Sequence, residues 1–155
     1  MKKVIAVFMV LIVYAGFAFA EEIARDSRFV AYDNGTVLDT KTNLMWAAKD
    51  NGSNINWMDA KSYCKNYRGG GYKDLRMPTR DELAGLYDAD KPYKSDCGYD
   101  VYLTGLIRLT CAWVWASETR GSAAAFFTFI DGEHHWHPQS HFNFSRALPV
   151  RSVNR

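Results

Sequence analysis

The chain has 155 residues, of which 19 are Lys or Arg, 17 are Asp or Glu and 15% are aromatic. All acidic residues follow Ala20, whereas Lys2 and Lys3 precede it. Removing these two from the 19 basic residues leaves 17, which equals the 17 acidic residues. The part of the chain after Ala20 therefore has no net charge, which supports neither nucleic acid nor another polyanion as a partner. It is long enough for one domain with one core.

Residues 1–20 have the three parts of a secretory signal. Lys2 and Lys3 form the charged start, residues 4–17 form the apolar run, and Ala18-Phe19-Ala20 is an A-x-A cleavage site. The alternative is an uncleaved membrane anchor, but the run is shorter than the ~20 residues that a spanning helix needs. We therefore predict a cleaved signal, a periplasmic or extracellular mature protein, and no integral membrane segment after cleavage.

Three short strands are predicted early in the mature chain. Residues 29–32 and 36–38 are rich in β-branched and aromatic side chains and flank an Asp-Asn-Gly sequence, which is a strong hairpin signal. Residues 44–46, Leu-Met-Trp, indicate a third strand. The residues before this region, 21–28, are predicted to be a short N-terminal lead.

A first helix is predicted after Asn56. Asn56 is a suitable N-cap, and Asp59 lies where the helix dipole favours a negative charge. Apolar residues recur at three- and four-residue steps and predict one buried stripe: Trp57, Ala60, Cys64 and Tyr67. Gly69-Gly70-Gly71 then ends the helix.

A second helix is predicted after Pro78. Thr79 and Glu82 have the spacing of a capping box. Leu83, Leu86 and Tyr87 supply its expected buried face. Just before it, Asp74 and Arg76 are expected to pair with each other or bond to the backbone, which is a structural role.

The second half of the chain is expected to be mainly strands. Residues 91–110 have no regular pattern and are predicted to be irregular, with a helical turn near residues 103–109. Asp131-Gly132 predicts a two-residue hairpin turn. The predicted strands are residues 114–116, 125–130, 133–137 and 146–153. Together these elements predict an α+β domain with a mainly antiparallel sheet and two short helices.

The three cysteines are expected to meet an oxidising compartment after export. Cys97 and Cys111 enclose a short, poorly patterned segment, and a bridge there would contribute about 3 kcal/mol by the loop-entropy model. Cys64 lies on the apolar stripe of the first helix and is interpreted as a buried free thiol. We favour Cys97–Cys111, although the spacing also allows Cys64 to pair with either of them.

All four histidines lie between residues 133 and 141. On a strand, Glu133, His135 and His137 would share one face, and His134 would share the other with Trp136. The first three could hold a metal ion with an open position. The alternative is an exposed polar arm, and no metal or other cofactor is favoured.

Six segments carry a family resemblance: Asn34–Asp39, Thr42–Trp46, the Trp57–Cys64 pattern Trp-x-x-Ala-x-x-Tyr-Cys, Asp74–Thr79, Val114–Ser117 and Leu148–Arg151. In this order they resemble the Lcl C-terminal domain family over residues 29–153. The departures are Leu75, where the family usually has Trp, and Met77 in place of Leu, and both keep an apolar side chain.

The resemblance implies one compact domain, residues 29–153, related in fold to C-type lectins and formylglycine-generating enzymes. It also implies an extracytoplasmic binding or adhesion module. The enzymes of that fold use cysteines late in the chain, but this sequence has none after Cys111. The Glu-Pro-Asn and Trp-Asn-Asp motifs of calcium-dependent sugar binding are also missing from it.

We therefore predict a non-catalytic module that recognises a glycan, a cell-surface polymer or a protein through its late loops and hairpin. Hydrogen-bonding and stacking side chains favour this segment as a contact surface. The alternatives are a structural subunit of a surface assembly and a metal-dependent enzyme that uses Glu133, His135 and His137. The candidate contact residues are His134, His135, Trp136, His137, Gln139, His141, Phe142 and Asn143.

Overall fold

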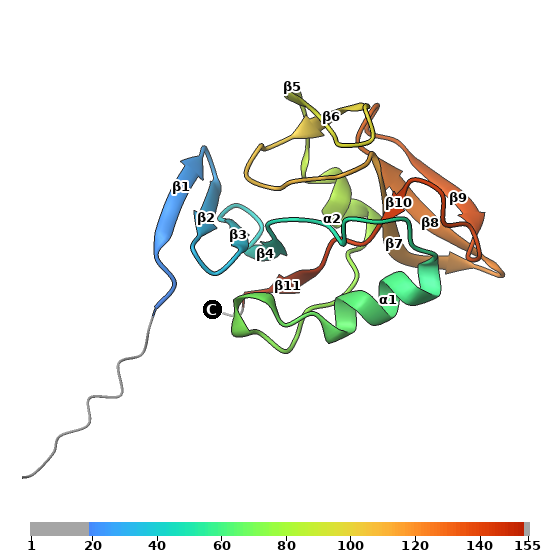
Figure 1. Ribbon diagram of the computed structural model, residues 1–155, viewed down its shortest axis with the longest axis horizontal. Helices are drawn as coiled ribbons and strands as arrows, with labels where there is room; N and C mark the ends of the chain where they lie inside the picture. Colours follow the sequence, from blue (N-terminus) through green and yellow to red (C-terminus); the bar gives the residue numbers. More distant parts are fainter. Residues whose placement is uncertain (1–18, 154–155) are drawn as a thin grey trace, which may run out of the picture.

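The computed structural model describes residues 19–153, so the predicted signal lies almost wholly outside the described residues. Two sheets, a separate β-hairpin and two short α-helices make up the domain (Figure 1). Nearly all strand pairs are antiparallel, which confirms the predicted α+β class. Within the described part of the chain, every helix is too short or too polar to cross a lipid bilayer.

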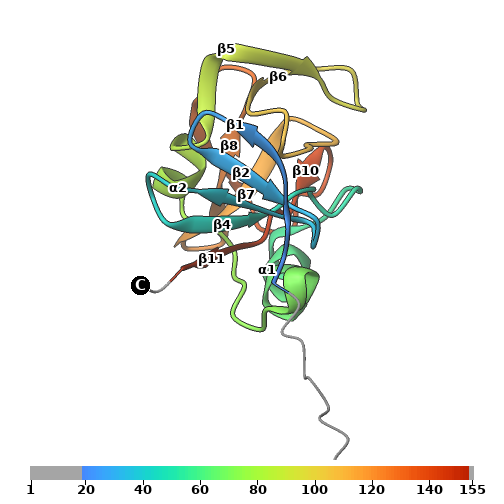
Figure 2. The same cartoon turned by 90° about the vertical axis from the view of Figure 1, so that its left-hand side faces the viewer.

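The first sheet has the strand order β1-β2-β3-β4-β11, and all its neighbours are antiparallel (Figure 2). The predicted early hairpin and third strand are confirmed, and Gly35 supplies the positive φ of 79° that the turn requires. β1 lies within the predicted lead, where mostly exposed side chains leave no alternating pattern to predict it. The strands are β1 (Glu22–Asp26), β2 (Phe29–Tyr32), β3 (Thr36–Asp39), β4 (Leu44–Ala47) and β11 (Val150–Ser152).

The first helix, α1 (Trp57–Asn66), begins where its cap predicts. The Asn56 Oδ1 atom accepts a hydrogen bond from the Asp59 amide at 2.9 Å. Trp57, Ala60 and Cys64 are buried, as the stripe predicts, and Tyr67 follows the helix as its C-cap. A 3₁₀ turn, η1 (Gly69–Gly71), comes next.

The second helix, α2 (Arg80–Ala84), has the predicted capping box. The Glu82 amide donates to Thr79 Oγ1 at 3.2 Å, and the Thr79 amide donates to Glu82 Oε2 at 2.8 Å. Leu83 and Leu86 are buried. Tyr87 was predicted to belong to this helix, but it begins the next strand because α2 ends after five residues.

The prediction of an irregular segment is wrong for the two strands that it contains, whereas residues 104–110 are irregular and include a turn in which the Ile107 amide donates to the Thr104 carbonyl at 3.2 Å. β5 (Tyr87–Lys94) and β6 (Asp100–Leu103) form an antiparallel hairpin. β5 carries Pro92 and several charges, and its register shifts between Tyr87 and Pro92, so it lacks the alternation that identifies a strand. The predicted Cys97–Cys111 disulfide is present, and Cys64 is buried and free.

The second sheet has the order β10-β7-β8-β9. The β8–β9 connection runs over residues 129–133, so the predicted two-residue turn is too short. The predicted last strand is two strands separated by residues 147–149, and β10 pairs with β7 in parallel. Pro149 lies in that gap and has no amide hydrogen for a ladder. The strands are β7 (Trp113–Arg120), β8 (Ala123–Thr128), β9 (His134–Pro138) and β10 (Ser145–Arg146).

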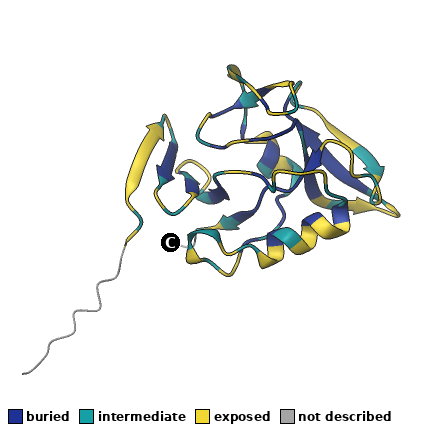
Figure 3. Cartoon of the chain, viewed as in Figure 1, coloured by how far each residue is buried: buried dark blue, intermediate teal, exposed yellow. Residues whose placement is uncertain are grey.

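Apolar clusters cover both faces of the second sheet, because alternate side chains of β7 and β8 point to opposite faces. Val114 and Phe127 belong to the larger cluster, which includes the helix residue Leu83. Trp115 and Phe126 belong to the smaller cluster beneath α1. Figure 3 shows buried ribbon along β7 and β8 and exposed ribbon along much of β9. The outer strand β9 is therefore where the sheet meets solvent.

Candidate functional site

The side chains of β9 alternate between two faces, as the sequence predicts. His135 and His137 lie against Phe126 on the α1 side of the sheet, with ring centroids 5.6 and 4.8 Å away. His141 follows the strand and brings its ring within 4.7 Å of His137. Three of the four histidines therefore lie along one face.

His134 and Trp136 lie on the opposite face, among cations. Arg80 bonds to His134 Nε2 at 2.9 Å. The Arg80 and Arg120 guanidinium carbons lie 5.6 and 4.4 Å from the Trp136 ring centroid, and Trp136 also packs against the larger core cluster. The predicted contact residues are thus divided between two faces. Trp136 is fixed in place by the two arginines and by the core cluster.

The loop after β9 is tied to the body of the domain. The Gln139 amide donates to the Ser122 carbonyl at 3.0 Å, and the Phe144 amide donates to Asn54 Oδ1 at 3.0 Å. His141 Nε2 lies 3.1 Å from the Asn143 carbonyl oxygen. These contacts hold the loop over the α1 side of β9, while Phe142 is 54% exposed on the surface.

An exposed aromatic cluster lies beside these histidines. Trp113 contacts Tyr99 and Phe144, with ring centroids 5.2 and 5.6 Å away. Tyr99 and Phe144 are 38% and 47% exposed. Phe144 has a φ of 59°, which is a strained conformation for a bulky residue.

A cavity of about 220 Å³ joins the aromatic cluster to the histidines. We call the surface around it the late face. Sequence reasoning found its histidines and Asn143, and it missed the aromatic cluster because Tyr99, Trp113 and Phe144 come from three separate segments. The late face consists of Tyr99, Trp113, Phe126, His137, His141, Asn143, Phe144 and Ser145.

The protonation of His137 is affected by this setting. Partial burial lowers the pKa of its imidazole below the ordinary 6.5, and the nearby His141 and His135 lower the pKa further. At neutral pH the His137 ring is therefore mainly uncharged, with one nitrogen that donates a hydrogen bond and one that accepts.

The geometry does not support the candidate metal ligands, a set that the sequence suggests without favouring a metal site. Glu133 lies in the exposed connection before β9, whereas His135 and His137 lie against Phe126. Among residues 19–153, no three His, Cys, Asp or Glu side chains gather closely enough to hold a metal ion.

Asp74 and Arg76 do not pair with each other, but Arg76 bonds to the backbone, as the alternative predicted: its Nη1 atom donates to the Met77 carbonyl at 3.4 Å. Arg76 forms two hydrogen bonds with Glu82, at 2.8 and 2.7 Å, and Asp74 accepts from Arg151 at 2.7 Å. Burial alone would raise the pKa of Glu82, but the Arg76 guanidinium and the Thr79 amide outweigh it and hold the pKa below 4.5. Both residues of the predicted pair thus tie separate segments together.

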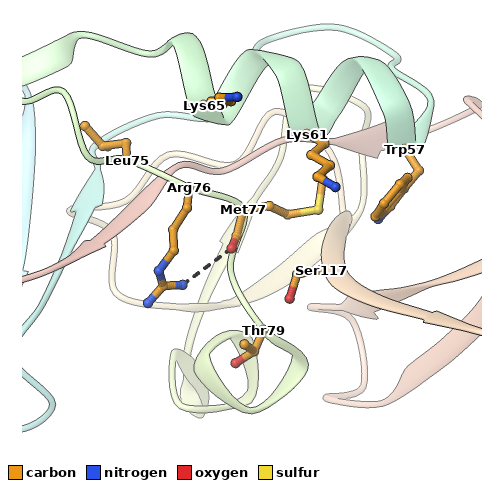
Figure 4. Close-up of a pocket in the computed structure, with 8 residues that line it drawn as sticks. All are labelled: Trp57, Lys61, Lys65, Leu75, Arg76, Met77, Thr79 and Ser117. Atoms are coloured by element: carbon orange, nitrogen blue, oxygen red, sulfur yellow. Dashed lines mark hydrogen bonds between the residues drawn. The ribbon is translucent and has the colours of Figure 1, made fainter.

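A second depression, of about 470 Å³, lies between α1 and the segment that leads into α2 (Figure 4). We call it the α1 pocket. No sequence motif identified it, because its walls are brought together only by the packing of α1 against the strand β7. Its lining residues are Trp57, Lys61, Lys65, Leu75, Arg76, Met77, Thr79 and Ser117.

The fold and these surfaces define a small disulfide-bonded α+β domain whose surface includes the late face and the α1 pocket. The Cys97–Cys111 bridge fits a periplasmic or extracellular protein. Residues 35–151 match the family model of the Lcl C-terminal domain, and the chain belongs to that family. The family suggests a secreted or surface-associated domain. No curated protein matches the chain.

Proposed function

We propose that the protein is a non-catalytic binding module, periplasmic or extracellular, whose late face recognises sugar rings of a glycan or cell-surface polymer. The observation that carries this proposal is the exposed aromatic cluster of Tyr99, Trp113 and Phe144. Its rings offer apolar faces to the C–H face of a sugar, and such amphipathic aromatics are typical of binding surfaces.

Polar groups beside the aromatic cluster can bind the hydroxyl groups of the same ring. The Asn143 side chain has both donors and an acceptor, and the neutral His137 can play either role. The strained Phe144 supports the proposal further. A left-handed conformation costs a bulky residue about 1–3 kcal/mol, and a glycine there would avoid that cost but provide no ring.

A glycan array probed with the mature protein tests the proposal. Phe144→Asn is the informative variant, because asparagine tolerates positive φ and the change removes only the ring. We expect this variant to lose about tenfold or more in affinity for the glycans that the parent protein binds, since burying one Phe side chain contributes about 1.5–3 kcal/mol.

Trp136→Ala is the matched control, because Trp136 is an aromatic residue of β9 on the opposite face. We expect it to bind the same glycans as the parent if it remains folded. Loss of binding in Trp136→Ala together with full binding in Phe144→Asn would transfer the site to the other face of β9. A parent protein that binds no glycan would refute the proposal.

A further inference from the structure

We propose that the α1 pocket is a second binding site, separate from the late face, for a small organic anion with an apolar body. The pocket has a floor and a mouth of different chemistry. Trp57, Leu75 and Met77 are apolar residues that are all less than 7% exposed, and they line the depression with only a small part of their surfaces. Their exposed parts form an apolar surface whose contact with water is unfavourable, so an apolar ligand that covers it would be stabilised.

The mouth of the pocket is cationic. Lys61 and Lys65 lie four residues apart on α1, and both are exposed. Figure 4 shows Lys61 reaching from α1 toward Met77 and Ser117. Its ammonium nitrogen lies 5.2 Å from the Trp57 ring centroid, a cation–π contact that holds the charge above the apolar floor.

These two lysines have no acidic partner among residues 19–153. No Asp or Glu side chain lines the pocket, and the third cation, Arg76, is already paired with Glu82. Like charges four residues apart slightly destabilise a helix. An anion bound between Lys61 and Lys65 would remove this repulsion.

The apolar floor and the cationic mouth of the α1 pocket together define the ligand that would bind there. An inorganic anion would leave the apolar floor unused, and a neutral apolar molecule would leave the lysines without a partner. A carboxylate or sulfonate attached to an aromatic or aliphatic body satisfies both. The volume of about 470 Å³ is within the ~300–1,000 Å³ that small-molecule sites occupy.

Titration of the ¹⁵N-labelled protein with 2-naphthoate, followed by NMR, tests this site. We expect saturable shifts centred on residues 57–65 and 75–79. The neutral analogue 2-naphthylmethanol should bind about fivefold more weakly, since it lacks the charge that two exposed lysines attract. Inorganic phosphate at the same concentration should not displace 2-naphthoate.

The double variant Lys61→Gln/Lys65→Gln should bind both naphthyl compounds equally. Lys41→Gln removes the same kind of charge from the exposed turn after β3, and it should keep the preference for 2-naphthoate. The inference is overturned if the parent protein shows no saturable shifts or no preference for the anion. It is also overturned if the double variant keeps that preference, if phosphate competes effectively, or if the shifts centre on the late face.

Discussion

The rings of His137 and His141 lie 4.7 Å apart, one on β9 and the other in the loop that follows it. Burial and the neighbouring imidazoles lower the pKa of His137. Near and below pH 6.5 the folded state therefore binds fewer protons at this position than the unfolded state. The contribution of His137 to the free energy of unfolding therefore falls as the pH drops from about 6.5 through the lowered folded pKa.

His141→Gln should raise the pKa of His137, because it removes the neighbouring ring that opposes a second positive charge. The measurement is the NMR titration of the His137 ring protons. His134→Gln serves as the control, since His134 lies on the opposite face of β9. Equal effects of the two substitutions would show that the contact between His137 and His141 does not set the pKa.

Thr79→Ala should lower the free energy of unfolding by about 1 kcal/mol, because the Glu82 amide in the first turn of α2 loses its partner. Denaturant unfolding measures the change. Thr42→Ala, in an exposed turn, should have little effect. An unchanged midpoint for Thr79→Ala would mean that the cap does not stabilise α2.

Glu82→Gln should lower the free energy of unfolding by about 1 kcal/mol at pH 7 and by less at pH 3. The lowered pKa of Glu82 means that its ion pair with Arg76 stabilises the fold above the ordinary value of 4.5. This stabilisation is lost as the pH falls through the folded pKa. Unfolding curves at several pH values test the prediction, with Asp81→Asn as a charge-matched control from the same helical turn. If Glu82→Gln lowered the free energy of unfolding by the same amount at every pH, the prediction would be contradicted.

Thiol labelling should find almost no reactive cysteine in the native protein. Burial raises the pKa of the Cys64 thiol to about 12, so little thiolate forms, and Cys97 and Cys111 are already bridged. After unfolding without reductant, one thiol per chain should react, and peptide mapping should place it at Cys64. Three reactive thiols would disprove the disulfide in the isolated protein, and a dimer linked through Cys64 would contradict its burial.

Thr110→Val should cost about 1–3 kcal/mol, because Thr110 Oγ1 connects two buried charged groups. It donates to Asp50 Oδ1 at 2.8 Å and accepts from Arg146 Nε at 2.7 Å. Thermal or denaturant unfolding measures the loss. Thr119→Val makes the same chemical change at an exposed position of β7 and should be nearly neutral. Equal stability of the two variants would show that the buried connection contributes nothing.

Some features of this domain follow from the sequence because they depend on neighbours a few residues apart. The caps at Asn56 and Thr79 are satisfied by amides three residues further along, and the Gly35 turn needs only local geometry. The alternation of His134 and Trp136 with His135 and His137 follows from the pleat of one strand. β5 could not be predicted in this way, because its pairing with β6 overrides an unfavourable sequence that contains Pro92.

Only the tertiary structure decided the aromatic part of the late face and the whole α1 pocket. Tyr99, Trp113 and Phe144 meet because the 97–111 disulfide region and the loop after β9 both pack beside β7. The α1 pocket likewise lies between α1 and residues 75–79, which are far apart in the sequence. From the sequence alone, the apolar residues of its floor cannot be distinguished from ordinary core residues. Amino-acid types and local periodicity therefore determined both helices, their caps, most of the strands and the family. Long-range packing determined which side chains share a surface, since contacts between distant segments depend on the whole fold.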